Sequence, residues 1–193
     1  MRIIAGRFKG LRLPSPKSKG VRPTTDRVRE ALFSTLGHDV THARVLDLFA
    51  GTGAFGFEAL SRGAASVVFV DNDHHVTQDL SGMCRALGVE NQVRILTMSA
   101  DRAVKRLSGS EERFEIIFLD PPYGEQLIPK VVHDPTFASL FERDSLLIVE
   151  REEKATELAV PIGFEKEFSR KYGGTIVEIF RYCVGDVSIF PLR

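Results

Sequence analysis

From residue 44 onward, short apolar runs alternate with longer stretches in which apolar residues recur every three or four positions. The runs match the period of buried strands, and the stretches match amphipathic helices. This pattern predicts strands at 44–49, 66–71, 93–97, 114–120, 145–150, 164–170 and 175–182, and helices at 54–62, 74–87, 100–107 and 125–141. The first five strands are almost continuously apolar, which is typical of a buried parallel sheet in an α/β fold.

The last two predicted strands are joined only by Lys171-Tyr172-Gly173-Gly174-Thr175. So short a link permits a hairpin but not a helical crossover. One of these two strands must therefore run antiparallel. The pattern predicts a seven-stranded, mostly parallel sheet.

The first part of the chain shows a different pattern, with two short apolar stretches around a turn. Residues 2–6 and 10–14 are typical of the strands of a hairpin, with its turn at Arg7-Phe8-Lys9-Gly10. Residues 15–20 have the composition of a loop, and a helix opens after Arg22-Pro23-Thr24-Thr25, where either threonine can cap it. We therefore expect a small β-hairpin extension at 1–20 and one larger domain at 21–193, of which residues 184–193 show no pattern.

The composition is that of an ordinary soluble globular protein, with 43% apolar and 27% charged residues in 193. No apolar run approaches the roughly 20 residues of a membrane span, and the apolar start is too short for a signal peptide. We therefore expect a cytoplasmic protein without membrane contact. Cys84 and Cys183 lack the close spacing of a metal or redox motif, so we expect reduced thiols and no metal site.

A net charge of zero conceals a strongly basic amino terminus. Residues 1–30 hold nine Lys or Arg against two acids, a balance of +7, whereas residues 31–193 hold 17 basic and 24 acidic residues. A basic segment on an acidic body is typical of a face that binds a polyanion, usually nucleic acid, although a solvated charged end would have the same composition. The candidate substrate contacts are Arg7, Lys9, Arg12, Arg22, Thr24 and Thr25.

A glycine motif stands between the first strand of the sheet and the helix that follows it. Gly51-Thr52-Gly53-Ala54-Phe55-Gly56 matches G-x-G-x-x-G, whose glycines allow a tight turn and let a ligand approach the backbone. Twenty residues past Gly51, the second strand ends at Asp71-Asn72, placed for ribose hydroxyls unless Asp71 only caps the next helix. The motif alone leaves open both a nicotinamide-dependent oxidoreductase and an S-adenosylmethionine (SAM) enzyme.

Residues near the other strand ends favour SAM. Asp47 and Phe49 precede the glycine turn, and a carboxylate there suits the ammonium group of SAM but would repel a pyrophosphate. The third strand is followed by Ala100 and Asp101, suited to the ring and edge of adenine, although Asp101 could equally cap a helix. These residues follow the carboxyl ends of successive strands, where open α/β sheets bind ligands.

The fourth strand ends in Asp120-Pro121-Pro122-Tyr123, the most informative segment of the chain. The carboxylate can accept one N–H of a planar amine, and the Pro121 carbonyl can accept a second. The tyrosine ring can then stack on the plane of a base. The alternative is an ordinary Pro-Pro turn that the aspartate initiates. The tetrapeptide resembles the D/N-P-P-Y/F signature of methyltransferases that modify exocyclic or amide nitrogens.

Together these segments resemble the RsmD family of bacterial small-subunit rRNA guanine-N2 methyltransferases. The resemblance covers roughly residues 1–182 and rests on residues 2–6, 13–14, 22–30, 47–56, 58–64 and 120–123. It implies a Rossmann-like, class I SAM methyltransferase fold with a seven-stranded sheet and a reversed last strand pair. It also implies one guanine as substrate, position 966 of 16S rRNA in the small ribosomal subunit. We expect the protein to act as a monomer.

Several alternatives remain from the residues alone. A DNA adenine-N6 methyltransferase would use the same tetrapeptide, but this chain leaves little room for a sequence-reading domain. A protein-glutamine methyltransferase usually carries Asn in place of Asp120 and has no need of the basic segment. From a different class, a non-catalytic RNA-binding factor would transfer no methyl group, and an NAD-dependent oxidoreductase would bind NAD.

Overall fold

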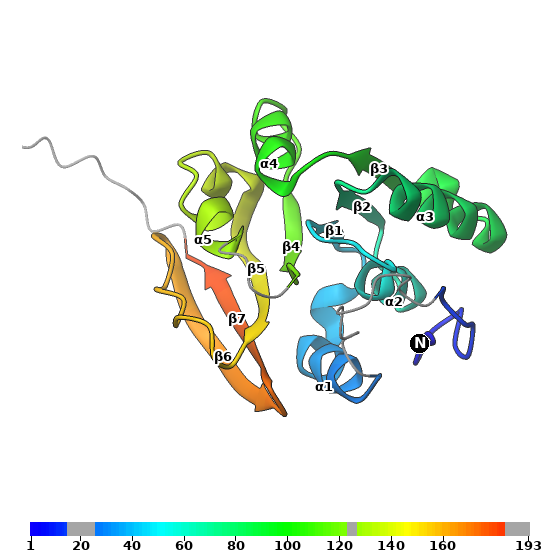
Figure 1. Ribbon diagram of the computed structural model, residues 1–193, viewed down its shortest axis with the longest axis horizontal. Helices are drawn as coiled ribbons and strands as arrows, with labels where there is room; N and C mark the ends of the chain where they lie inside the picture. Colours follow the sequence, from blue (N-terminus) through cyan, green and yellow to red (C-terminus); the bar gives the residue numbers. More distant parts are fainter. Residues whose placement is uncertain (15–25, 123–126, 184–193) are drawn as a thin grey trace, which may run out of the picture.

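The computed structural model describes residues 1–14, 26–122 and 127–183, and within these ranges seven strands form one sheet (Figure 1). They lie in the order β3-β2-β1-β4-β5-β7-β6. Their bounds are β1 Arg44–Asp47, β2 Ser66–Asp71, β3 Val93–Thr97, β4 Phe114–Leu119, β5 Phe141–Glu152, β6 Phe164–Tyr172 and β7 Thr175–Tyr182. The seven predicted strands are confirmed, each within a few residues of its predicted ends.

Strand direction also follows the prediction. Neighbouring strands from β3 across to β5 pair in parallel, whereas β7 pairs antiparallel with both β5 and β6. This confirms the predicted, mostly parallel sheet, in which the last two strands, β6 and β7, run antiparallel to each other. The strand order changes direction between β1 and β4, and open α/β sheets bind ligands beyond the carboxyl ends of the strands at such a point.

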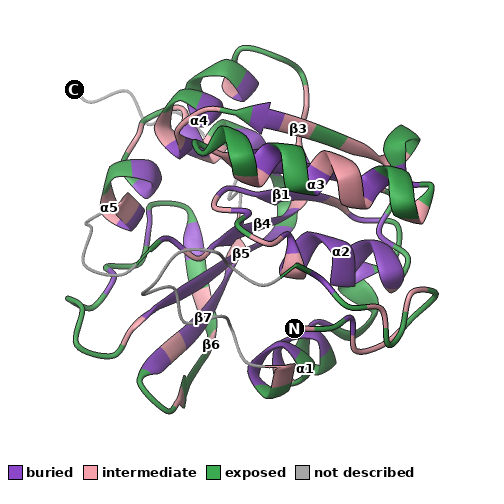
Figure 2. Cartoon of the chain, turned by 45° about the vertical axis from the view of Figure 1, so that its right-hand side comes forward, coloured by how far each residue is buried: buried purple, intermediate pink, exposed green. Residues whose placement is uncertain are grey.

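Helices cover both faces of the sheet. The helices α1 (Asp26–Leu36), α2 (Ala54–Ser61) and α3 (His74–Leu87) pack on one face, and α4 (Ala100–Ser108) and α5 (Leu127–Val132) pack on the other. Val45 of β1 faces the first core, and its neighbour Leu46 faces the second. Burial on both faces explains why β1, β2 and β4 are almost continuously apolar, whereas β6 at the edge is mostly exposed (Figure 2). No helix in the described ranges is long and apolar enough to cross a membrane.

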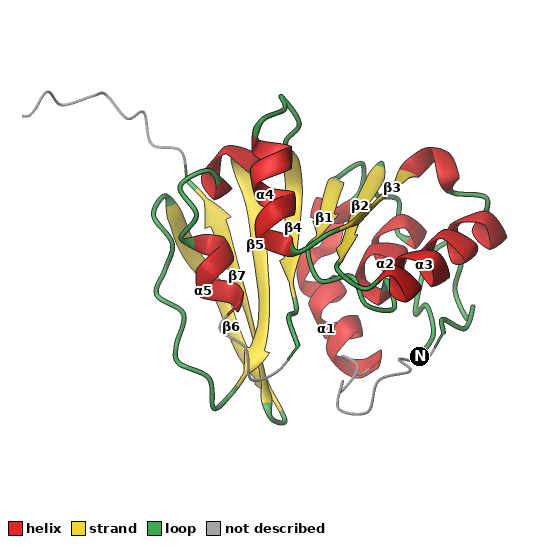
Figure 3. Ribbon diagram, turned by 45° about the horizontal axis from the view of Figure 1, so that its top comes forward, coloured by secondary structure: helices red, strands yellow, loops and turns green. Residues whose placement is uncertain are grey.

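The predicted helix at 125–141 is wrong. The described part of this region forms α5 and then the short 3-10 helix η3 (Phe137–Leu140), with a turn between them (Figure 3). Pro135 lacks a helical N–H and disfavours a helical conformation at Asp134. The Asp134 carboxylate accepts the backbone N–H and the hydroxyl of Thr136 at 2.9 and 2.6 Å, which stabilises the turn. Consequently β5 begins at Phe141, four residues before its predicted start at 145. Two further short 3-10 helices, η1 (Gly37–Val40) and η2 (Glu90–Gln92), connect other elements.

The N-terminal segment folds back along α2. Its two predicted strands reduce to a single antiparallel bridge between Arg2 and Arg12, with a turn between them. Ile3 and Leu13 are buried in the core that α1, α2 and α3 share, so this hairpin packs directly on the main fold. The predicted domain boundary after residue 20, the helix cap at Thr24 or Thr25, and residues 184–193 lie outside the described residues.

Candidate active site

Four acids singled out by the sequence lie at or near one edge of the sheet. Asp47 ends β1 and Asp71 ends β2, while Asp120 directly follows Leu119, the last residue of β4. Asp101 lies in the first turn of α4, the helix that follows β3. The parallel register pairs Asp47 with Phe69 and Phe118, and Asp71 with Thr97, which brings the strand ends together. We call this edge, formed by Asp47, Asp71, Thr97 and Leu119, the carboxyl edge.

The three glycines of the turn after β1 have different roles. Gly51 has a φ of +50°, is exposed, and has nothing within 4 Å of the place where a Cβ would stand. Gly53 also has a positive φ, 72°, and is the N-cap of α2, with its missing Cβ facing Leu80 and Phe57 at 2.6 Å. A Cβ on Gly56 would lie 2.2 Å from the ring of Phe69, so this glycine lets α2 pack closely on β2. Only Gly51 of the three therefore leaves space for a ligand.

Asp47 is buried, with 1% of its surface exposed, and its Oδ1 has no hydrogen-bond partner among the described residues. Burial raises its pKa from 3.8 to about 7, while the backbone N–H of Gly56 opposes the shift and the nearby charge of Asp71 adds to it. A buried acceptor without a partner is costly, so the site suits a cationic donor. The residue therefore fits the ammonium group that the sequence assigned to it.

Asp71 holds the glycine turn to β2. Its Oδ2 accepts the backbone N–H of Gly51 and its Oδ1 accepts that of Asp73, each at 2.9 Å. The cap of α3 is Asp73, whose carboxylate accepts the N–H of His75 at 2.7 Å, so the alternative role of Asp71 as the helix cap is wrong. Sequence reasoning missed the Gly51 bond. A ribose contact of Asp71, and of the exposed Asn72 beside it, stays a prediction.

The first turn of α4 contains a contact that the sequence did not reveal. The Asp101 carboxylate lies 3.4 Å from the ammonium of Lys130 on α5. Its pKa is lowered, first by a hydrogen bond from the Ser99 side chain and then by Lys130. Ala100, the first residue of α4, is buried in the core. Phe49, which follows β1, is half-buried. An adenine contact from these residues stays a prediction.

The segment Asp120-Pro121-Pro122 leaves the sheet beside the glycine turn. Asp120 is half-buried, Pro121 is buried and Pro122 is exposed, while Tyr123 lies outside the described residues. Just before them, the ring of Phe118 stacks on that of Phe55, the second residue of α2, at 4.0 Å and 9°. This contact fixes the end of β4 against α2. Within the described ranges, no three His, Cys, Asp or Glu side chains are grouped so as to hold a metal ion.

The hairpin contacts α2 near both of its ends, so its basic residues do not all lie near the carboxyl edge. Near that edge, the sulfur of Met1 accepts the hydroxyl of Thr52 at 3.4 Å. At the other end of α2, the N–H of Arg7 donates to the carbonyl of Ser61 at 2.9 Å. Lys9 and Arg12 are exposed. The predicted contacts Arg22, Thr24 and Thr25 lie outside the described residues.

Glu58 of α2 anchors the hairpin, a role that the sequence did not indicate. This fully buried carboxylate accepts the backbone N–H groups of Ile4 and Ala5 at 2.7 and 3.1 Å. It also pairs with Arg62 at 2.7 Å and lies 3.9 Å from the buried Arg29 of α1. A buried charge needs such partners, and here they come from the hairpin, α1 and α2. An acid in an apolar helix segment was the only signal that could have drawn attention to it.

Comparisons with known proteins agree with this fold. Residues 1–181 match the family described as Conserved hypothetical protein 95. Ribosomal RNA small subunit methyltransferase D of Escherichia coli K12 is 38% identical over 79% of this chain and 75% of its own length. YlbH of Bacillus subtilis is 35% identical over 94% of this chain and 98% of its own length. The solved structure of yhhF from Escherichia coli has a TM-score of 0.81 and 31% identity, and the match covers 96% of this chain and 99% of that one. The chain therefore belongs to the Conserved hypothetical protein 95 family, that of the RsmD methyltransferases, as its motifs predicted.

Proposed function

We propose that this protein transfers a methyl group from SAM to the exocyclic N2 amine of a guanine in 16S rRNA, position 966 of the small ribosomal subunit. The observation that carries the proposal is the segment Asp120-Pro121-Pro122 at the end of β4, beside Asp47 and the glycine turn at the end of β1. Methyl transfer to nitrogen needs an amine-binding segment next to a cofactor-binding turn, because the two reactants must be held together. Relatives named as small subunit rRNA methyltransferases support rRNA as the substrate.

The residues at and near the carboxyl edge fit the cofactor. When bound, SAM would supply a methyl group that its sulfonium makes electrophilic, with a neutral thioether left after the sulfur–carbon bond breaks. The buried Asp47 carboxylate, with its unused Oδ1, would hold the ammonium group, and the open space at Gly51 would admit the ligand to the backbone. Asp71 and Asn72 would accept the ribose hydroxyls. Phe49, Ala100 and Asp101 would contact the adenine.

Asp120 and Pro121 would prepare the target amine. The exocyclic nitrogen of guanine is a weak nucleophile because its lone pair is delocalised into the ring. Accepting one N–H at the Asp120 carboxylate and the other at the Pro121 carbonyl favours a pyramidal nitrogen whose lone pair points at the methyl carbon. The carboxylate also stabilises the positive charge that develops on the nitrogen as its bond to carbon forms. Catalysis would therefore come from orientation and a fixed negative charge, and the surplus proton would leave to water.

The base must leave its stack to reach this segment. Sequence-specific recognition of RNA usually uses bases that are splayed out and stacked on an aromatic side chain. Tyr123 would supply that ring. Arg7, Lys9, Arg12, Arg22, Thr24 and Thr25 would contact the RNA backbone, and a cytoplasmic location would follow from the ribosomal substrate.

The test is transfer of labelled methyl groups from SAM to unmethylated 16S rRNA and to 30S particles, followed by mapping of the modified base. We expect one guanine to be labelled at its N2 position. The proposal is wrong if the label appears on adenine or on ribosomal protein, or if the chain transfers no label to either RNA substrate.

A further inference from the structure

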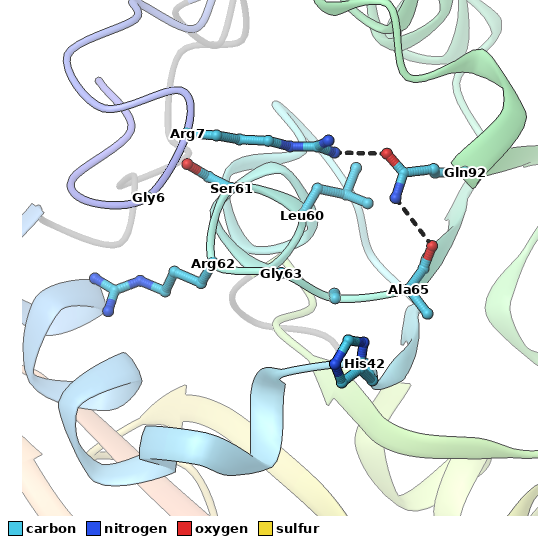
Figure 4. A pocket seen from close by; sticks show the side chains of 10 residues that line it. Gly6, Arg7, His42, Leu60, Ser61, Arg62, Gly63, Ala65 and Gln92 are labelled. Carbon is cyan, nitrogen blue, oxygen red and sulfur yellow. Dashed lines mark hydrogen bonds between the residues drawn. The ribbon is translucent and has the colours of Figure 1, made fainter.

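A concave surface lies at the far end of α2 from the glycine turn (Figure 4). This pocket of about 480 Å³ is lined by Gly6 and Arg7 of the hairpin, His42 before β1, residues 60–65 and Gln92. We call it the α2 pocket. Its volume is within the range of ligand sites, and none of the described residues that line it is acidic. We infer that the α2 pocket binds a phosphodiester group of the RNA backbone, away from the target base, an inference that rests on the proposed function.

Arg7 provides the main positive charge. Its guanidinium donates to the side-chain oxygen of Gln92 at 2.6 Å, and the Gln92 amide donates to the carbonyl of Ala65 at 3.2 Å (Figure 4). The guanidinium also lies over the ring of Phe8, at 4.5 Å from its centroid. Because these partners are neutral, they hold the side chain in place without cancelling its charge. A fixed guanidinium is well suited to the oxygens of a phosphate.

His42 supplies a second donor across the pocket from Arg7. Its backbone is left-handed, with a φ of +65°, and its N–H donates to the carbonyl of Gly63 at 2.8 Å. This conformation is unusual for a residue other than glycine, and it lets the exposed imidazole ring lie beside the pocket (Figure 4). The positive charge of Arg62 has less effect on the pocket, because it pairs with the buried Glu58 at 2.7 Å. The side chain also points away from Gln92 (Figure 4).

The helix end itself does not oppose an anion strongly. The carboxyl end of a helix carries partial negative charge on its last carbonyls, which would repel a phosphate. Here these carbonyls are already occupied. Ser61 accepts the N–H of Arg7 at 2.9 Å, Leu60 that of Gly63 at 3.2 Å, and Ala59 that of Ala64 at 3.0 Å. Since no acid among the described residues pairs with Arg7, its charge then dominates the pocket.

The location of the pocket sets which phosphate it can bind. The eight residues of α2 span roughly 12 Å, and they separate the glycine turn from Ser61. A phosphate in the α2 pocket therefore belongs to a nucleotide other than the target. The tip of the hairpin would thus contribute to RNA binding, although the tip lies at the far end of α2 from the residues proposed for methyl transfer.

Binding of a 16S rRNA transcript at a series of KCl concentrations tests the inference. We expect Arg7→Gln and His42→Ala to raise the dissociation constant several-fold, and Arg7→Gln to flatten the log–log salt slope by about 0.7 to 0.9, the value for one lost phosphate contact. The matched control is Arg85→Gln, which removes an exposed arginine on α3 that contacts Ser81. This control should leave the slope unchanged.

Equal slopes for the wild type and Arg7→Gln, or equal flattening in Arg7→Gln and Arg85→Gln, would overturn the inference. Methyl transfer by the wild type to the same transcript is measured separately. If the wild type methylates the RNA but Arg7→Gln leaves the slope unaltered, the α2 pocket is not a phosphate site and the proposed function stands. If the wild type transfers no methyl group, the proposed function fails, while the slopes still decide whether the pocket binds RNA.

Discussion

In its proposed role Asp47 must be ionised to hold an ammonium group, yet its burial opposes that charge. Its pKa is raised from 3.8 to about 7, so the folded protein holds this proton more tightly than the unfolded chain between those values. Stability falls with rising pH wherever the folded state binds more protons. In the free protein, ionisation of Asp47 therefore costs increasing folding free energy from about pH 4 to about pH 7, and the cost is complete above that.

Asp47→Asn should remove this pH-dependent cost. Relative to the wild type, the variant should gain about 3 kcal/mol of stability between pH 5 and pH 8, because about two of the roughly three pKa units of the shift lie between pH 5 and pH 7. Urea unfolding of both proteins at the two pH values, without SAM, measures the difference. A gap between the two proteins that stays constant with pH would show that Asp47 does not titrate in this range.

SAM affinity should depend on the same proton. Since the proton must leave before the ammonium group binds, wild-type affinity should fall below about pH 7, by up to tenfold per pH unit. Asp47→Asn should bind SAM weakly at every pH. Titration calorimetry across this range checks both expectations, and strong pH-independent binding by the variant would contradict the assignment.

Asp120→Ala should separate chemistry from cofactor binding. The carboxylate is expected to contact the target amine, so its loss should lower the rate roughly a hundredfold, or about 3 kcal/mol, with SAM affinity almost unchanged. Asp120→Asn keeps one acceptor oxygen without the charge. Its methylation rate should therefore lie between those of the wild type and Asp120→Ala. Single-turnover methylation and calorimetry give the two readouts. Methylation within a few-fold of the wild type would remove Asp120 from the reaction.

At the scale of elements, the hairpin docks on α2 through a contact that only glycine allows. A Cβ on Gly6 would lie 1.8 Å from the carbonyl oxygen of Ser61, and its φ is +79°. Gly10, in the same turn, has a φ of +87° but nothing within 4 Å. The two glycines therefore share a left-handed backbone that would strain an alanine, but they differ in the space around a Cβ, which makes them a matched pair.

Gly6→Ala should destabilise the protein more than Gly10→Ala does. The second variant carries only the left-handed strain, about 1 kcal/mol, whereas the first must also move the hairpin or the end of α2. Urea unfolding measures both. Equal losses of stability would mean that the Gly6 contact with Ser61 relaxes without cost.

Sequence patterns identified the central strands well because burial on both faces makes β1, β2 and β4 almost unbroken apolar runs, whereas β6 is mostly exposed and its short link to β7 indicated a hairpin. They failed for the helix at 125–141, where Pro135 and the Asp134 turn outweighed an apolar spacing that also suits a helix. In the site, strand ends placed Asp47, Asp71 and Asp120 correctly at one edge. The Asp101 pair with Lys130 and the Glu58 contacts join segments far apart in the chain, which no local pattern reveals.

For the whole molecule, the contacts of Glu58 connect the hairpin, α1 and α2. Glu58→Gln would remove the buried carboxylate that pairs with Arg62 at 2.7 Å and lies 3.9 Å from Arg29. Among the described residues, Arg29 would keep only its ion pair with Asp26, at 3.0 Å. Removing one partner of a buried pair typically costs about 3–5 kcal/mol. Glu112→Gln is the control, since its pair with Arg94 is at the surface and should contribute about 1 kcal/mol or less. Denaturant unfolding compares them, and losses of similar size would show that the Glu58 contacts add little.

The insertion of β7 between β5 and β6 has a consequence for incomplete chains. Without β7, the twelve-residue strand β5 would present one open side, and β6 would have no neighbour in the sheet. The open side would combine unpaired backbone groups with the apolar run 146–149, an arrangement that pairs readily with other chains. A chain broken between β6 and β7 would therefore keep every residue of the carboxyl edge and still be a substrate for aggregation or for the proteases that remove unfinished proteins.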